Sequence, residues 1–147
     1  MIFKRPSKQL ERRKLRIVFD TNLLISAVFF GGKPFELLNL VKNGQIAVIV
    51  TPDILSEYKR SLFNFSKDEA IAAEWHSYFR EFGTLVQVTR KFNLCRDADD
   101  NKFLDAAHAG KADFIVSGDK DLREVKGFHI PVSTVAVFLA TVKWKIE

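Results

Sequence analysis

Short apolar runs alternate with longer segments of helical periodicity along most of the chain, and this alternation restricts the fold more than any other feature. The apolar runs predict strands at 15–19, 46–50, 85–88 and 114–116, with a short fifth strand at 129–132. The intervening segments predict helices at 23–30, at 35–41, from Pro52 onward, at 67–82, at 102–109 and after Ser133 or Thr134. Strands separated by helices are typical of a parallel sheet, so we expect an α/β fold, a three-layer α/β/α sandwich around a mainly parallel sheet of four to five strands.

The size and composition indicate one self-sufficient domain. The chain has 147 residues, of which 47% are hydrophobic and 28% charged, the balance of an ordinary globular protein. No apolar run approaches the roughly 18 to 20 residues of a membrane-spanning helix, and the N-terminal segment lacks the apolar stretch of a secretory signal. The single cysteine, Cys95, cannot form an internal disulfide and is expected to be a partly buried structural residue. These features predict a cytoplasmic protein with no membrane contact.

The positive charge is confined to the N-terminus. Residues 1–16 contain seven basic residues and one acidic residue, a local charge of +6, and subtracting it from the total of +5 leaves −1 for the other 131 residues. We therefore divide the chain into a basic arm, 1–14, and a folded domain, 15–147. The arm can neutralise nucleic-acid phosphates or simply aid solubility, and the sequence leaves both roles open.

Four acidic residues stand where the predicted strands end or where the following helices begin. Asp20 directly follows the first strand, and Asp119 follows the fourth within two residues. Glu57 lies in the second turn of the helix after the second strand, and Asp100 lies near the start of the helix before the fourth. Ligands bind beyond the carboxyl ends of parallel strands, so these four carboxylates are candidates for a common site.

A cluster of carboxylates repels itself unless cations are bound. Mg²⁺ and Mn²⁺ suit such oxygen-rich sites and keep coordination positions for water and substrate phosphates. A water bound there can be activated without a nucleophilic side chain, so the expected reaction is the hydrolysis of a phosphodiester.

Each acid also has a structural interpretation. Asp20 can cap the next helix, and Asp119 lies in a sequence typical of turns. Glu57 can be an exposed helical residue that pairs with Lys59 or Arg60. The combination of acids is therefore more informative than any one of them.

Four segments in order give a more specific signal. They are IVFDTNLLISA at 17–27, TPDILSEY at 51–58, CRDADDNKFLDAAHAGKADFIVSGDKDL at 95–122 and PVSTVAVFL at 131–139. Together they resemble a PIN domain across residues 15–142, most closely the VapC-like branch of toxins from toxin–antitoxin systems. The DTN after the first strand and the DDNKFL with a downstream SGDKDL carry most of the resemblance.

The resemblance implies roles for particular residues. It makes Asp20, Glu57, Asp100 and Asp119 the acidic catalytic quartet, with Asp20, Asp100 and Asp119 as metal ligands. It places Asn22 and Ser117 where the family has polar residues that orient ligands or contact phosphate.

The third acid departs from the pattern of the family. Asn101 and Lys102 separate Asp100 from the apolar part of its helix, whereas many VapC proteins place this acid directly against the apolar pattern. Asp97 or Asp99 can therefore share its role or replace it.

The family further implies a Mg²⁺- or Mn²⁺-dependent endoribonuclease with RNA as substrate, frequent homodimers and, in the toxin branch, an antitoxin that covers the active site. The alternative is a PIN-like RNA-binding or regulatory module that does not cleave. An aromatic cluster around two predicted helices suits both core packing and an interface with an antitoxin or a second copy: Phe63, Phe65, Trp75, Tyr78, Phe79 and Phe82. The three histidines, His76, His108 and His129, lack the spacing of zinc ligands and are expected to be structural.

Overall fold

A computed structural model describes residues 14–142, and the predicted arm falls almost entirely outside these residues. Five strands form one parallel sheet in the order β3-β2-β1-β4-β5. The strands are β1 Leu15–Phe19, β2 Ile46–Val50, β3 Thr84–Leu85, β4 Phe114–Val116 and β5 Val132–Ser133. The α/β class and the parallel sheet are confirmed.

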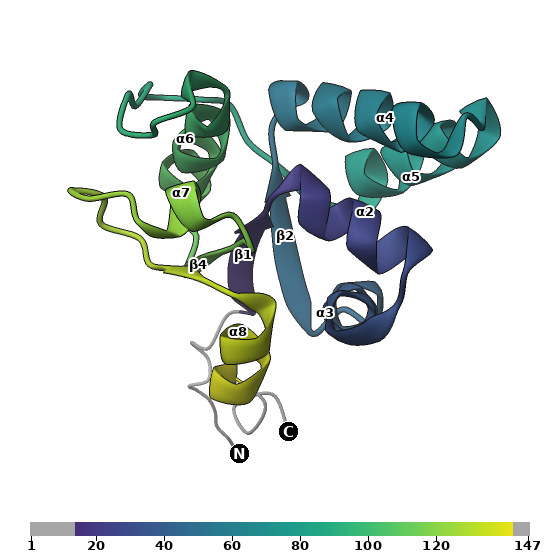
Figure 1. Ribbon diagram of the computed structural model, residues 1–147, viewed down its shortest axis with the longest axis horizontal. Coiled ribbons are helices and arrows are strands. Elements are labelled where there is room, and N and C mark those ends of the chain that lie inside the picture. Colours follow the sequence, from purple (N-terminus) through teal and green to yellow (C-terminus); the bar gives the residue numbers. More distant parts are fainter. Residues whose placement is uncertain (1–13, 143–147) are drawn as a thin grey trace, which may run out of the picture.

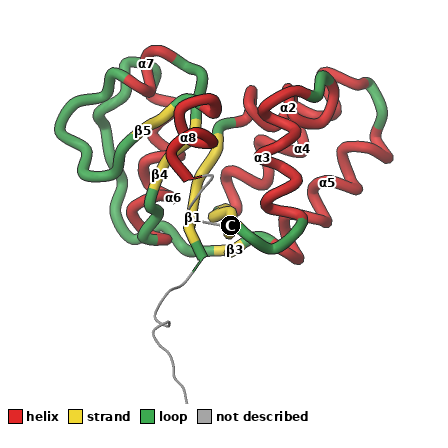
Figure 2. Tube along the Cα trace, turned by 90° about the horizontal axis from the view of Figure 1, so that it is seen from below, coloured by secondary structure: helices red, strands yellow, loops and turns green. Residues whose placement is uncertain are grey.

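Helices cover the sheet on both sides (Figures 1 and 2). They are α2 Thr21–Phe29, α3 Gly32–Lys42, α4 Pro52–Ser66, α5 Glu69–Phe82, α6 Asn101–Gly110, α7 Lys120–Arg123 and α8 Val135–Val142, with a 3₁₀ turn η1 at Ala98–Asp100. Helices α2 to α5 lie on one side, and α6 and α7 lie on the other. Helix α8 contacts α3, and α6 contacts the three central strands.

The central strands are buried on both faces because helices flank them. Ile17, Val18, Ile49, Val50 and Ile115 have no solvent exposure. Such strands are continuously apolar rather than alternating, and this explains why the sequence gives strong signals for β1 and β2. Their bounds match the predicted 15–19 and 46–50.

Polar side chains start most of the helices at the carboxyl ends of strands. Asp20 accepts a hydrogen bond from the Leu23 N–H at 2.8 Å and so caps α2. Thr51 caps α4 in the same way, with Pro52 as the first helical residue. Thr134 accepts from the Val137 N–H at 3.2 Å and begins α8, as one of the two predicted openings. Each cap satisfies a backbone donor that the helix leaves free.

The edge strands differ most from the prediction. The third strand is Thr84–Leu85 rather than 85–88, and the fifth is Val132–Ser133 rather than 129–132. Each edge strand is paired on one side only, so few apolar neighbours determine its length. Pro34 lies in the first turn of α3 rather than between helices, a position where its missing N–H costs no intrahelical hydrogen bond. Helix α7 and η1 are too short for periodicity to predict.

Helix α6 packs very closely on the sheet. A side chain at Gly110 would approach Ile49 within 2.7 Å, so only glycine permits this contact without displacement. This packing fixes the helix that follows Asp100.

Within residues 14–142, no single helix is both long and apolar enough to cross a membrane, although α2 and α3 together reach that length and composition across a bend of 96°.

Candidate active site

The ends of β1 and β4 place two acids side by side. Phe19 pairs with Val116, and the Asp20 N–H donates to the Val116 carbonyl at 3.3 Å. Asp20 is therefore fixed at the carboxyl edge of the sheet, next to the turn that begins with Ser117. Asp119 ends this turn and caps α7 by accepting from the Asp121 N–H at 2.9 Å. Asp20 thus caps a helix, as its structural interpretation held, while Asp119 lies at the end of a turn and also caps the next helix, and both acids line one site.

Ser117 connects these two acids. Its hydroxyl donates a hydrogen bond to Asp20 Oδ2, and its oxygen accepts from the Asp119 N–H at 2.9 Å. Ser117 has no solvent exposure, so it orients the acids and does not reach into solvent. Asn22 is exposed on the first turn of α2 and lines the same cavity.

Glu57 projects from α4 toward these acids but is held by protein donors. Its Oε2 accepts from the Thr21 hydroxyl, and its Oε1 accepts from the Lys102 ammonium. The Arg60 guanidinium lies 3.9 Å from the same Oε1. The predicted pairing with Arg60 is confirmed, but Glu57 is not an exposed residue, since only 13% of its side chain is accessible.

Lys102 lies among the acids on the first turn of α6. Its side chain is only 15% exposed, and its Nζ also lies 3.2 Å from Asp99 Oδ1. Contacts with two carboxylates keep the pKa of Lys102 raised although burial alone would lower it. A cation is thus built into one side of the acidic site.

The three candidates for the third acid occupy different positions. Asp99 and Asp100 line the cavity, whereas Asp97 is exposed and caps η1 by accepting from the Asp99 N–H. The pKa of Asp100 is raised to about 6, first by burial and then by the negative charge of Asp119 and Asp97. The position of Asp100 makes it the strongest candidate of the three, and its identity as a ligand stays a prediction.

Together these residues line an open cavity of about 280 Å³. Its acidic residues are Asp20, Glu57, Asp99, Asp100 and Asp119, and its other lining residues are Thr21, Asn22, Arg60, Ser61 and Phe103. The structure therefore brings all four predicted acids to one place. Burial raises the pKa of Asp20, the hydrogen bonds from Ser117 and Leu23 lower it, and nearby Asp119 and Glu57 raise it further.

The donor set fits a hard divalent cation. All candidate ligands are oxygen atoms, and a bound cation would relieve the repulsion by Asp119 that helps to raise the pKa of Asp100. Within residues 14–142, no group of three or more acidic, cysteine or histidine side chains already has the arrangement of a metal site. Mg²⁺ tolerates this arrangement because it keeps several waters and is completed by substrate oxygens.

Several supporting residues have no signal in the sequence pattern. Asn101 accepts hydrogen bonds from the N–H groups of Leu94 and Cys95 at 3.1 and 3.0 Å, and Asp105 accepts from the Phe92 N–H at 2.7 Å. These contacts hold the preceding loop against α6 and thereby fix the position of η1. The contacts of Thr21 and Lys102 with Glu57 also give no signal in the sequence, because Glu57 is distant from both residues along the chain.

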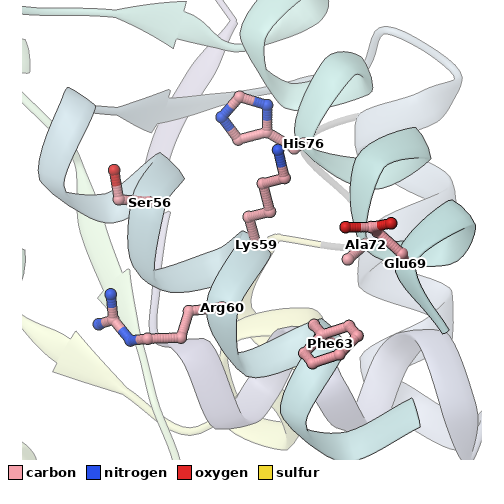
Figure 3. Close-up of a pocket in the computed structure, with 7 residues that line it drawn as sticks. All are labelled: Ser56, Lys59, Arg60, Phe63, Glu69, Ala72 and His76. Carbon is pink, nitrogen blue, oxygen red and sulfur yellow. The ribbon is translucent and has the colours of Figure 1, made fainter. Parts of the chain in front are cut away.

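A second cavity, of about 460 Å³, lies between α4 and α5 next to the acidic one (Figure 3). Its lining residues are Ser56, Lys59, Arg60, Phe63, Glu69, Ala72 and His76. Lys59 extends toward His76, whereas Arg60 points away from α5. Burial lowers the pKa of His76, and the positive charges of Lys59 and Arg80 lower it further. Arg60 lines both cavities, so a groove with two basic residues, Lys59 and Arg60, and one acid, Glu69, adjoins the acidic site, and we call it the basic groove.

The aromatic cluster divides between core and surface. Phe79 is fully buried, whereas Phe63, Phe65 and Phe82 are exposed. Phe65 also contacts Phe29 and Phe30, and Phe30 is 70% exposed. The cluster therefore contributes to the core and leaves apolar surface that no described residue covers.

Comparisons with known proteins agree with this architecture. The PIN domain model matches residues 16–121. MJ1680, an uncharacterised protein of Methanocaldococcus jannaschii, is 30% identical in an alignment that covers 90% of this chain and 94% of that protein. The crystal structure of VapBC2 from Rickettsia felis bound to a DNA fragment from their promoter is similar in fold, with a TM-score of 0.56, 14% identity and coverage of 80% of this chain and 98% of that chain. The chain therefore belongs to the PIN-domain family.

Proposed function

We propose that this protein is a Mg²⁺- or Mn²⁺-dependent endoribonuclease that hydrolyses RNA phosphodiester bonds in the cytoplasm. The observation that carries the proposal is the convergence of Asp20, Asp100 and Asp119 in an open cavity, without a cationic partner within 4 Å among the described residues. Such a site is consistent with membership of the PIN-domain family, whose members are generally nucleases. Carboxylates held together without compensation favour the binding of a cation.

Each residue has a role in this proposal. Asp20, Asp100 and Asp119 hold the metal, Ser117 orients two of them, and Asn22 offers an exposed amide to the substrate phosphate. A bound divalent ion supplies an activated water and stabilises negative charge on the phosphate. Glu57 has both carboxylate oxygens engaged, so it fixes the Thr21 hydroxyl and the Lys102 ammonium beside the reacting phosphate.

The basic groove supports RNA as the substrate. Lys59 and Arg60 can neutralise phosphates on one side of the scissile bond, and the exposed ring of Phe63 can stack with a base. A single strand leaving the acidic cavity past Arg60 would enter this groove directly.

The direct test is the cleavage of a labelled single-stranded RNA by the full chain. We expect cleavage with Mg²⁺ or Mn²⁺, none after chelation, and none by Asp20→Asn or Asp119→Asn. Asparagine can still cap a helix, so both variants should fold, which circular dichroism would check. Asp53→Asn, at an exposed acid in the first turn of α4, is the matched control and should cleave normally. Cleavage by both site variants contradicts the proposal.

The alternative, a PIN-like RNA-binding or regulatory module, is distinguished by the same preparation. RNA binding without any binding of metal in calorimetry would support that alternative. If the protein binds metal but cleaves none of several unrelated RNAs, its substrate would have to be a specific RNA.

We further propose that the enzyme is the toxin of a toxin–antitoxin pair. The similarity in fold to VapBC2 and the exposed apolar surface formed by Phe30 and Phe65 support this role. That surface also suits a homodimer. Expression of the chain alone should arrest bacterial growth, while coexpression with the product of the adjacent reading frame should relieve the arrest. Growth arrest by the Asp119→Asn variant as well would contradict toxicity through RNA cleavage.

A further inference from the structure

Lys102 is an unusual residue in a site proposed to attract cations. It is largely buried, and its ammonium contacts Glu57 Oε1 while lying 3.2 Å from Asp99 Oδ1. The other Glu57 oxygen accepts from the Thr21 hydroxyl. The carboxylate of Glu57 is thus saturated by protein donors before any ion arrives.

The site therefore has two unequal halves. The uncompensated half consists of Asp20, Asp100 and Asp119, which have no cationic partner within 4 Å among residues 14–142. The compensated half consists of Glu57, Asp99 and Lys102, and the more exposed Arg60 guanidinium lies 3.9 Å from Glu57 Oε1. A divalent ion in the compensated half would lie in contact with the Lys102 ammonium. The repulsion between the two would be twice that between the ammonium and a monovalent ion at the same distance.

We propose that Lys102 serves as the fixed second cation of this site, so that the protein binds one divalent ion, in the uncompensated half, rather than two. This inference rests on the proposed function, because it presumes that the site binds a metal. Two-metal sites place a positive charge on each side of the phosphate, and here the ammonium supplies one of the two.

A lysine suits this position for a physical reason. Its ammonium is a compact charge on a flexible stem and donates up to three hydrogen bonds, enough for Glu57, Asp99 and one substrate oxygen. Because α6 is fixed tightly on the sheet through Gly110, the Lys102 backbone cannot withdraw easily from Glu57.

The experiment counts Mn²⁺ ions bound to the full chain by native mass spectrometry and calorimetry. We expect one ion in the wild type, one in Lys102→Arg, which keeps the charge, and two in Lys102→Met, in which Glu57 and Asp99 become available. Lys33→Met, at an exposed lysine on α3, is the matched control and should bind one ion. The melting temperature of metal-free Lys102→Met should fall, and its rise on adding Mn²⁺ should exceed that of the wild type.

The outcomes separate this inference from the nuclease proposal. Two ions in the wild type, or one in folded Lys102→Met, would overturn the inference while leaving the nuclease proposal intact. Wild-type protein that binds no ion would overturn both. If Lys102→Met does not fold, Lys102→Gln replaces it, and the counts for the wild type and Lys102→Arg still decide the question. A purely structural role for Lys102 would lower the melting temperature without changing the number of ions.

Discussion

The two halves of the acidic cavity solve the same electrostatic problem in different ways. The compensated half neutralises Glu57 with Lys102, whereas the uncompensated half holds Asp20 and Asp119 together with neutral donors only. In the uncompensated half, burial first and then the negative charge of neighbouring carboxylates raise the pKa of Asp100. Buried carboxylates of like charge cost stability unless a cation is present. The protein itself thus neutralises the charge of one half, whereas the charge of the other half is left for the cation that we propose.

This contrast also follows from where the residues lie in the fold. The uncompensated acids Asp20 and Asp119 follow strand ends, where backbone geometry fixes them closely. The compensated residues belong to α4, η1 and α6, and they meet only because α6 packs against the sheet. The first arrangement depends on the topology and the second depends on side-chain pairing.

The largest expected effect is on catalysis by the uncompensated half. Asp100→Asn changes a candidate ligand whose side chain makes no capping hydrogen bond to α6, so the fold should persist. We expect RNA cleavage to fall by about 100-fold or more, because loss of one preorganised charged group commonly costs that much. Initial rates with Mg²⁺ provide the measurement. Equal rates for wild type and variant at saturating metal would show that Asp100 is not a metal ligand, and Asp99 would then be the candidate for the third acid.

A smaller effect should appear in stability when the neutral donor of the uncompensated half is removed. Ser117→Ala leaves the partly buried Asp119 N–H without its acceptor and Asp20 Oδ2 without its hydroxyl donor. We expect the free energy of unfolding to fall by about 1 to 3 kcal/mol in a denaturant titration. Ser77→Ala, at an exposed position of α5, should have almost no effect. Similar stabilities for the two variants would show that Ser117 does not hold the acids together.

A third effect concerns the groove beside the compensated half. Lys59→Glu reverses a charge facing His76 and should weaken RNA binding by roughly three- to tenfold at low salt, with the difference shrinking as salt rises. Fluorescence anisotropy with Ca²⁺ in place of Mg²⁺ would measure binding. Lys111→Glu, at the exposed end of α6, is the control. If both variants bind equally well, the strand does not follow the groove.

The smallest expected effect is the pH dependence of the metal-free protein. The raised pKa of Asp100 means that its contribution to stability is present below its unfolded value of 3.8 and is lost as the pH rises through about 6. Metal binding requires the ionised carboxylate, so stabilisation by Mg²⁺ should grow over the same range. In Asp100→Asn, the metal-free melting temperature at neutral pH should be higher by about 2 °C. A lower melting temperature in that variant would contradict repulsion within the uncompensated half.

The basic arm adds one prediction that lies outside the described residues. Deletion of residues 1–13 should weaken RNA binding mainly at low salt if the arm neutralises phosphates. If the affinity for RNA is unchanged, the arm serves solubility rather than RNA binding.

The strands that carry the site could be predicted from the sequence because burial on both faces gives continuous apolar runs. Residues 15–19 and 114–116 match β1 and β4 in full, and the positions of Asp20 and Asp119 beyond them followed directly. The edge strands could not be placed as well, since each has a single pairing neighbour. The role of Lys102 could not be predicted from the sequence because it depends on contact with Glu57, 45 residues earlier in the chain. Asn101 and Asp105 act on a loop whose path no periodicity encodes.

The most direct test of the central claim is a crystal structure of the full chain with Mn²⁺ and a non-hydrolysable RNA. The account predicts anomalous density in contact with the carboxylates of Asp20, Asp100 and Asp119, and a phosphate of the RNA beside it. An ion bound elsewhere, or RNA bound while these three carboxylates contact neither metal nor phosphate, would contradict the account.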